Sequence, residues 1–348
     1  MDGMESGPVS RLDSGAWTID VRLNARDLSR ALRADARRGL FSSPKELSPK
    51  WFYDERGSRL FEIITRLPEY YPTAREREIL GRRAREIAEI AQPHTLVELG
   101  SGTSEKTRLL LDSLVRSGQL RRFVPFDVSE STLRAAAASV ASHYPGLEVR
   151  AVVSDFERGL QAIPRGERRL IAFLGGTIGN FKPAGRAAFY RELASQLAPG
   201  DSLLLGTDLV KDVRRLEAAY DDAAGVTAEF NRNILRVLNR ELGADFVPSN
   251  FEHVARYDAK QQWMEMWLRS TKEQQVRVRA LRRVVRFAAG EEMRTEVSAK
   301  FRRRRVSSEL ASAGLRLTHW WTDEHGDYAL SLSRPVRRRR HGKLSPAD

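Results

Sequence analysis

The stretch TLVELGSGTSEKT, residues 95–107, places two glycines between a short apolar run and a helical pattern. This order predicts a tight turn at Gly100 and Gly102 that holds a ligand against the start of a helix. In the dinucleotide fingerprint a third glycine follows, at the position that Glu105 occupies here. A carboxylate in the first turn opposes a pyrophosphate, and Glu98 adds a second acid at the end of the strand. The turn therefore favours a ligand with a positive centre over NAD(P).

S-adenosylmethionine fits this description, because it combines adenosine, a sulfonium cation and a zwitterionic amino-acid tail. The next predicted strands end in side chains that suit its other parts. Asp127 can accept both ribose hydroxyls, and Asp155 with the ring of Phe156 can receive the adenine. Lys106 can meet the carboxylate of the tail. Each has a simpler alternative, such as a helix N-cap for Asp127, core for Phe156 or solvated surface for Lys106, so the argument depends on the set. An NAD(P)-dependent oxidoreductase stays as the alternative.

Short apolar runs and longer helical patterns alternate between about residues 95 and 208. The runs are LVELG (96–100), FVPFDV (123–128), EVRAVVSDF (148–156), LIAFLGG (170–176) and DSLLLGTDL (201–209). Strands alternating with helices predict the α/β class, with a doubly wound, Rossmann-like parallel sheet. Ligands bind at the carboxyl ends of such strands, which is where the acidic residues stand.

The rhythm changes on both sides of this region. Residues 25–74 read as helical and aromatic-rich, residues 211–242 as helices, and residues 253–287 as period-two strands. A last hairpin is predicted with its turn at 323–326. We expect a flexible extension over 1–27, an α+β substrate-binding domain from 28–74 and 211–299, a methyl-donor domain from 75–210 and 300–334, and a basic disordered tail over 335–348.

The composition bounds the class of protein. The 348 residues are 41% hydrophobic and 30% charged, without the roughly 20 consecutive apolar residues of a membrane span. The N-terminus lacks the apolar region of a secretory signal. Cysteine is absent, which excludes disulfides and thiolate chemistry and fits a cytoplasmic protein. The six histidines lack metal-ligand spacing, so no metal is expected.

The net charge of +13 raises the alternative of a nucleic-acid partner. Much of the excess is local, in the runs 302–305 and 337–340. A nucleic-acid site would also need interleaved aromatics or a reading motif, and neither is found. We therefore expect no nucleic-acid and no membrane partner.

Six stretches carry a resemblance to a known family. They are KWFYDERGSRLFEIITRLPEYYPTARE (50–76), LVELGSGTSEKT (96–107), FLGGTIGNF (173–181), GTDLVKD (206–212), YDDAAGVTAEFNRN (220–233) and EEMRTEVSAKF (291–301). The chain thereby resembles the histidine-specific Nα-methyltransferases that open ergothioneine biosynthesis, over residues 28–334. The resemblance implies transfer of three methyl groups from S-adenosylmethionine to the α-amine of L-histidine, which gives hercynine. It also implies a monomer.

The resemblance assigns roles residue by residue. The donor is expected on Gly100, Lys106, Asp127, Asp155 and Phe156. The amino acid's amine and carboxylate are expected on Asn180 and Tyr220, with Tyr53 near the amine, and the imidazole on Tyr70, Glu296 and Ser298. Met266 is a further candidate for the imidazole pocket, whereas Trp263, Trp267, Trp320 and Trp321 are expected in the core.

The chemistry asks for these residue types. Methyl transfer mainly needs a neutral amine positioned against the methyl carbon. The uncharged amide of Asn180 can accept from the amine and donate to the carboxylate. Tyr53 acting through water, or bulk solvent, is the expected proton acceptor.

A neutral imidazole has one donor and one acceptor nitrogen, which Glu296 and Ser298 can read. Their spacing of two puts them on one face only if this segment is extended. The alternative is a surface helix in which Glu296 has no such role, and a different amino acid then becomes the substrate.

Overall fold

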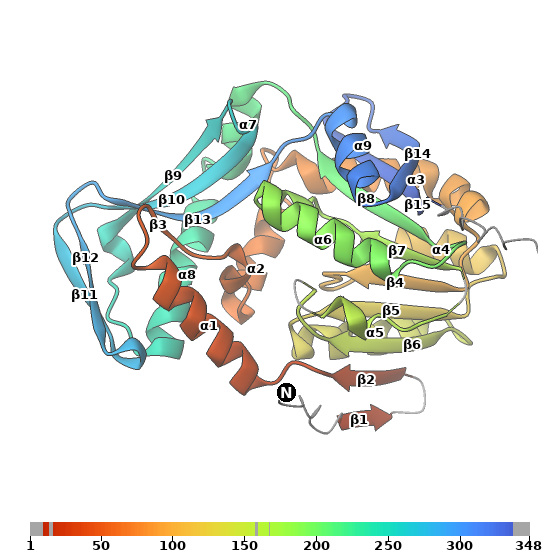
Figure 1. Ribbon diagram of the computed structural model, residues 1–348, viewed down its shortest axis with the longest axis horizontal. Helices are drawn as coiled ribbons and strands as arrows, with labels where there is room; N and C mark the ends of the chain where they lie inside the picture. The colour runs from red at the N-terminus through yellow and green to blue at the C-terminus, as the bar shows by residue number, and fades with distance from the viewer. Residues whose placement is uncertain (1–9, 14–16, 157–158, 167, 337–348) are drawn as a thin grey trace, which may run out of the picture.

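Parallel strands form the centre of the larger of two main sheets. The computed structural model describes residues 10–13, 17–156, 159–166 and 168–336, and these form a nine-stranded sheet (Figure 1). In spatial order its strands are β1 (Ser10–Asp13), β2 (Trp17–Val21), β6 (Glu148–Val153), β5 (Arg122–Asp127), β4 (Thr95–Leu99), β7 (Arg169–Phe173), β8 (Ser202–Asp208), β15 (Tyr328–Pro335) and β14 (Leu315–Thr322). The predicted runs and the final hairpin are confirmed as strands, and the Rossmann-like class with them.

The strand order places a switch point between β4 and β7. The six strands from β2 to β8 are parallel, and β15 and β14 close the sheet as an antiparallel hairpin. The chain proceeds from β4 to β5 and β6 on one side, then returns to β7 and β8 on the other. In open α/β sheets a ligand binds outside the carboxyl ends at such a reversal.

Helices cover both faces of this sheet. One apolar cluster joins it to α3 (Tyr71–Ala91), α4 (Arg108–Arg116) and α5 (Glu130–His143). A second joins its other face to α6 (Pro183–Gln196) and α9 (Arg303–Ser312), the two helices in front of the sheet in Figure 1. Strands buried on both faces read as continuous apolar runs, which is why they were recognisable in the sequence.

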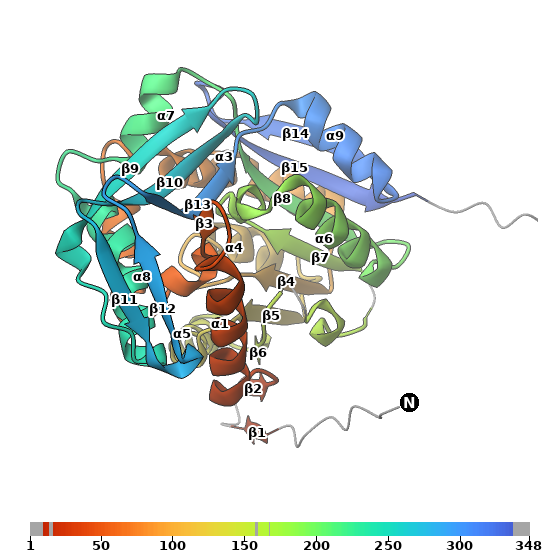
Figure 2. The ribbon, with the colours of Figure 1, turned by 60° about the vertical axis from the view of Figure 1, so that its left-hand side comes forward.

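A smaller α+β unit stands beside the strand ends. Its four-stranded sheet has the order β3 (Lys45–Glu46), β13 (Glu292–Ala299), β10 (Trp263–Ser270) and β9 (Phe251–Asp258), and β11 (Gln274–Val278) pairs with β12 (Arg283–Phe287). A third apolar cluster packs these strands on helices from both predicted segments. The helices are α1 (Ala25–Gly39), α2 (Glu55–Ile64), α7 (Val213–Tyr220) and α8 (Val226–Leu242). Figure 2 shows this unit beside the large sheet, with β13 nearest to it.

The N-terminal part of the chain is more ordered than the sequence predicted. The predicted flexible extension, residues 1–27, is wrong in part, because Trp17–Val21 forms β2 and pairs with β6. WTIDV lies between β1 and β6 in the large sheet, with Ile19 fully buried. The arginine tail from residue 337 onward lies outside the described residues.

Four tryptophans were predicted to lie in the core. Trp263, Trp267 and Trp321 are buried, and Trp320 is partly buried against the core. In the described part of the chain, no helix is long and apolar enough to cross a bilayer.

Candidate active site

The glycine turn follows β4 and opens onto empty space. Gly100 and Gly102 have φ of +67° and +51°, which favours glycine. The backbone N–H of Gly102 donates to Oδ2 of Asp127 at 3.0 Å, so the turn is held by the residue that ends β5. A Cβ at Gly102 would meet no atom within 4 Å. The loop therefore leaves open space beside Gly102 at the switch point of the sheet.

Unsatisfied polar atoms gather in the same loop. Oε2 of Glu98 and the hydroxyls of Ser101 and Ser104 are buried without a partner among the described residues. Burial raises the pKa of Glu98 to about 7, while the donating hydroxyl of Thr107 and the charge of Lys106 act in the opposite direction. Buried polar atoms ordinarily have partners, so these groups fit a polar ligand. An ammonium and a carboxylate, as on the tail of S-adenosylmethionine, would satisfy them.

Lys106 is fixed by a buried carboxylate. Its Nζ donates to Oε2 of Glu76 at 2.7 Å, and Glu76 is fully buried. The same carboxylate accepts from the backbone N–H of Gly175 at 2.8 Å and from the hydroxyl of Tyr328 at 2.8 Å. Glu76 thus ties the turn after β4 to the turn after β7. The sequence reasoning did not select it.

The third strand end carries the predicted adenine residues. Oδ2 of Asp155 accepts from Nζ of Lys50 at 3.4 Å, which links the loop after β6 to the KWFYD motif. The ring of Phe156 packs against Phe173 with centroids 5.3 Å apart. A Cβ on Gly100 would lie 3.6 Å from the Phe156 ring, so the ring stands directly beside the glycine turn. The structure brings all five predicted donor residues to one edge of the sheet.

Asn180 and Glu296 meet where the two sheets approach each other. Asn180 ends the short helix η3 (Thr177–Asn180) after β7, and Glu296 lies on β13. Nδ2 of Asn180 donates to Oε1 of Glu296 at 3.1 Å and to the carbonyl of Val297 at 2.9 Å. Both amide hydrogens are thereby used within the protein, so the expected donation to a substrate carboxylate is wrong for this geometry. The amide oxygen is left to accept, as a neutral amine requires.

Ser298 lies in a buried cluster of hydroxyls and charges. Its Oγ accepts from the hydroxyl of Tyr220 at 2.7 Å and from Nζ of Lys300 at 2.9 Å. Nζ of Lys300 also donates to the Tyr220 hydroxyl at 2.9 Å and pairs with Asp208 at 2.8 Å. Although burial opposes it, the charges of Lys300 and Lys211 hold the pKa of Asp208 below its usual value. Tyr220 therefore contacts the predicted ring-reading residue directly.

A β-bulge turns Glu296 toward this cluster. Glu296 lies opposite Met266 on β10, whereas Arg294 lies opposite Trp267, so Thr295 is the extra residue. The Thr295 hydroxyl donates to Oδ1 of Asn231 at 2.6 Å, which anchors the bulge on α8. Opposite residues of an antiparallel pair share a face, so Glu296 and Met266 project together. The extended conformation that the ring-reading hypothesis needs is present.

Two tyrosines stand near these groups. The ring of Tyr70 lies 6.5 Å from that of Tyr220 and 6.0 Å from that of Phe61, and Tyr53 lies 5.5 Å from Phe61. Burial raises the pKa of Tyr53, and the Glu296 carboxylate raises it further, although 40% of the residue as a whole is exposed. The Tyr53 hydroxyl therefore stays protonated. This disfavours it as a proton acceptor and leaves a role in orienting the amine.

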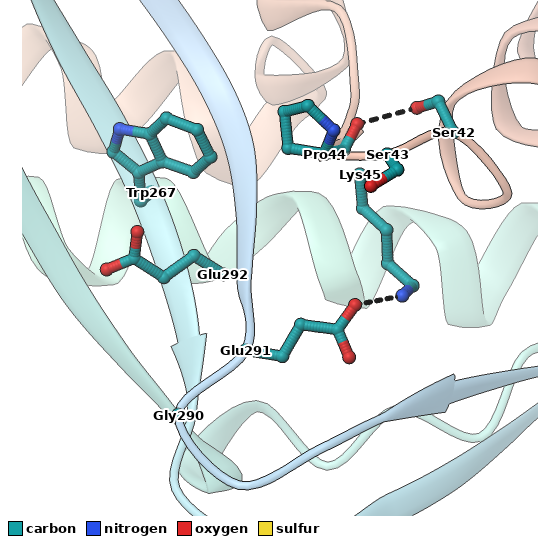
Figure 3. Close-up of a pocket in the computed structure, with 8 residues that line it drawn as sticks. All are labelled: Ser42, Ser43, Pro44, Lys45, Trp267, Gly290, Glu291 and Glu292. Atoms are coloured by element: carbon teal, nitrogen blue, oxygen red, sulfur yellow. Dashed lines mark hydrogen bonds and ion pairs between the residues drawn. The ribbon is translucent and has the colours of Figure 1, made fainter.

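Two cavities lie near the small sheet. One, of about 480 Å³, is lined by Asn180, Phe181 and Glu296 together with residues of α1 and α6, and it adjoins the strand ends. The other, of about 420 Å³, lies between the 42–45 loop and the β12–β13 turn (Figure 3). Its lysine, Lys45, pairs with Glu291, and none of the predicted site residues lines it. Of the predicted site residues, Asn180 and Glu296 line the first cavity, and the five donor residues do not.

Comparisons with known proteins establish the family of the chain. Residues 32–335 match the family described as "Histidine-specific methyltransferase, SAM-dependent". The chain belongs to this family. A relative named Histidine N-alpha-methyltransferase, from Mycolicibacterium smegmatis, is 60% identical over 311 residues, which is 89% of this chain and 97% of the relative. One of the same name from Mycobacterium tuberculosis is 60% identical over 87% of this chain and 94% of its own length. Ergothioneine biosynthesis protein 1 of Neurospora crassa is 29% identical over 92% of this chain and 37% of its own.

Within this methyltransferase, the sequence reasoning missed the buried charges that hold the site together. Glu76 and Lys300 both lie within the stretches that resemble the family, but only other residues of those stretches were assigned a role. Glu76 follows EYYPT in the helix pattern, and Lys300 precedes an arginine run. A charged residue inside an otherwise well-patterned element is the signal that marks such positions, because an unpaired buried charge is very costly.

Proposed function

We propose that this enzyme transfers methyl groups from S-adenosylmethionine to the α-amino group of L-histidine, three times in succession, giving hercynine for ergothioneine biosynthesis. One observation carries the proposal most directly. Glu296 and Ser298 share one face of β13, and Asn180 joins Glu296 to the loop after β7 by a 3.1 Å hydrogen bond. Ring recognition and amine recognition are thereby brought to the same strand ends as the glycine turn.

The imidazole pocket is built from one acceptor and one donor. Burial raises the pKa of Glu296 to about 7, with Lys300 and Asn180 acting in the opposite direction, so the carboxylate form accepts an imidazole N–H above that pH. The Ser298 hydroxyl already accepts two hydrogen bonds, which leaves its own hydrogen to donate to the other ring nitrogen. A side chain lacking either nitrogen would leave one of these buried groups unpaired.

The amine is oriented by a neutral amide. The amide oxygen of Asn180 can accept from an amine N–H, and the Tyr53 hydroxyl stays protonated. A neutral amide does not favour the ammonium form as a carboxylate would. The lone pair of the amine thus remains available, and water at the exposed side of Tyr53 takes the proton.

The methyl donor is held by the five residues at the sheet edge. When bound, S-adenosylmethionine supplies an electrophilic methyl group on a sulfonium and leaves as S-adenosylhomocysteine. Asp127 accepts the ribose hydroxyls, Phe156 contacts the adenine, and Lys106, oriented by Glu76, receives the carboxylate of the tail. Oε2 of Glu98 and the hydroxyl of Ser104, which have no hydrogen-bond partner among the described residues, would accept from the amino group of the tail.

The decisive experiment incubates the purified protein with S-adenosylmethionine and an equimolar mixture of the twenty amino acids, read by mass spectrometry. We expect histidine alone to gain three methylene units. Methylation of another amino acid would keep the donor site and overturn the ring assignment. If nothing reacts, calorimetry with S-adenosylmethionine tests whether the donor binds at all.

We further propose that the enzyme acts as a cytoplasmic monomer, as the family resemblance and the absence of cysteine suggest. Light scattering of the purified protein, with and without S-adenosylmethionine, tests the oligomeric state. A stable dimer in either condition would contradict it.

A further inference from the structure

A lysine that is completely buried stands behind the ring-reading serine. Lys300 ends the TEVSAK stretch just after β13, and none of its surface is exposed. An ammonium has three hydrogens and no acceptor. All three have partners here: the Asp208 carboxylate at 2.8 Å, the Tyr220 hydroxyl at 2.9 Å and Oγ of Ser298 at 2.9 Å.

The count of hydrogens and lone pairs then determines what Ser298 can offer a ligand. A hydroxyl has one hydrogen and two acceptor lone pairs. At Ser298 one lone pair receives Lys300 and the other receives the Tyr220 hydroxyl, at 2.7 Å. With both lone pairs filled in this way, the Ser298 hydrogen is directed away from the cluster and is left for a ligand.

We propose that Lys300 is a positioning residue for specificity, which commits the Ser298 hydroxyl to donating and so selects a ring with a bare acceptor nitrogen. The inference rests on the proposed function and goes one step beyond it. Glu296 requires a ring donor, and Lys300 acting through Ser298 requires a ring acceptor. A neutral imidazole meets both requirements at once.

Without Lys300, the Ser298 hydroxyl would no longer be committed to donating to the ligand. Its hydroxyl could then rotate and donate to Tyr220, and a lone pair would be open to a ring N–H. The pocket would tolerate a ring without an acceptor much better. Asp208 would not be left unpaired, because the Tyr71 hydroxyl donates to it at 2.9 Å and Lys211 also contacts it.

Lys211 provides the matched control. It pairs with the same Asp208 carboxylate and donates to the Tyr71 hydroxyl at 2.7 Å, but it makes no contact with Ser298 or Tyr220. The variants K300M and K211M therefore remove the same charge from the same carboxylate, and only K300M releases the two hydroxyls.

The experiment compares three substrates at pH 8.5, where Glu296 is ionised: histidine, pyrrolylalanine, which has a ring N–H and no acceptor, and thiazolylalanine, which has an acceptor and no N–H. The readout is kcat/KM for histidine divided by that for each analogue. Rejection of an analogue by an unpaired polar group reaches about 10⁴-fold. In K300M we expect the pyrrolylalanine ratio to fall at least tenfold and the thiazolylalanine ratio to stay unchanged. In K211M both ratios should match the wild type.

A double-mutant cycle tests the route. If Lys300 acts through Ser298, K300M changes the pyrrolylalanine ratio in the wild type but not in the S298A background. An equal fall of all three substrates in K300M, or the same shift in both backgrounds, would overturn the proposal. If K300M does not fold, K300Q takes its place: its amide offers two hydrogens, so an intermediate ratio is expected and an unchanged ratio counts against us. Failure of the wild type to methylate histidine would instead reject the proposed function itself.

Discussion

The side-chain amide of Asn180 donates to Oε1 of Glu296 across 3.1 Å, and this bond connects the loop after β7 in the large sheet to β13 in the small one. The same carboxylate is proposed to bind the imidazole. We expect Glu296→Ala to raise KM for histidine by at least a hundredfold, because an unpaired ring N–H costs about 1–3 kcal/mol and the Asn180 anchor is lost as well. Steady-state kinetics with histidine, alongside calorimetry for S-adenosylmethionine, gives both values. An unchanged KM would exclude the ring-reading role.

The activity should depend on pH through Glu296. Burial raises its pKa to about 7, and only the ionised form accepts from the ring. The value of kcat/KM for histidine should therefore fall as the pH drops through about 7. Histidine titrates nearby, so the comparison is the wild-type to Glu296→Gln ratio, from which the substrate's own titration cancels. A ratio that stays flat between pH 6 and 8 would contradict the prediction.

The raised pKa of Glu296 also predicts that ionisation of this carboxyl, which substrate binding needs, makes the folded protein less stable. A carboxyl whose folded pKa lies above its unfolded value of 4.5 favours folding only while protonated, so the protein loses stability as the pH rises from about 4.5 to 7. Glu296→Gln removes this loss. We expect the variant to be more stable than wild type by about 1–2 kcal/mol at pH 8, a figure reduced because the side chain is only partly buried, and equal at pH 4.5. Thermal unfolding across this range measures the difference.

Glu76 should matter for the methyl donor, although it lies behind the site. It is fully buried and accepts from Lys106, the Gly175 backbone and Tyr328. Glu76→Ala leaves these donors unpaired, so we expect a loss of about 3 kcal/mol in stability and at least a tenfold rise in Kd for S-adenosylmethionine. Glu78→Gln, two residues on in α3, changes a carboxylate that pairs with Arg75 at 3.2 Å and serves as the control. Equal effects of the two substitutions on Kd would refute the role of Glu76.

Substitutions at two glycines with positive φ can distinguish an effect on stability from an effect on ligand binding. Gly102 and Gly118 have φ of +51° and +73°, and a Cβ on either would meet no atom within 4 Å. Alanine at each should cost roughly 1 kcal/mol of backbone strain. Only Gly102→Ala should also weaken S-adenosylmethionine binding, because its methyl group would stand in the turn that is proposed to hold the donor. Calorimetry on both variants checks this, and a similar Kd in the two would place the ligand elsewhere.

Patterns within short windows predicted most of the large sheet. LVELG and DSLLLGTDL are buried on both faces, so their apolar runs were visible without any partner. The hairpin around Asp323–Gly326 was similarly local. Strand β2 was missed because WTIDV follows an acidic, glycine-containing stretch and pairs with β6, more than a hundred residues further along the chain.

Only those parts of the site that lie at strand ends or within motifs were predictable from the sequence. Extended geometry at Glu296 and Ser298 was a condition of the ring-reading hypothesis, and the residues alone left a surface helix open; the structure has a strand there. The bulge at Thr295, which sets the face that Glu296 occupies, depends on a hydrogen bond to Asn231 and carries no period of its own. The pairing of Lys106 with Glu76 spans 30 residues, and that of Lys300 with Asp208 spans two separate motifs, so neither is encoded in a local pattern.

After β8 the chain leaves the large sheet and later re-enters it at the same place. Leu209, just after β8, forms a bridge with Phe301, and the Phe301 N–H donates to the Asp208 carbonyl at 2.8 Å. The segment between them, which carries α7, α8 and β9 to β13, is therefore an insert whose two ends are hydrogen-bonded neighbours, whereas α1, β3 and α2 join the small unit from the N-terminal part of the chain. Inserts with adjacent ends are the kind that a host domain tolerates. The large sheet can therefore accept a different insert at the same position. Replacing the insert at the β8–Phe301 junction is a route to methylating a different amino acid while leaving the residues proposed to bind the methyl donor unchanged.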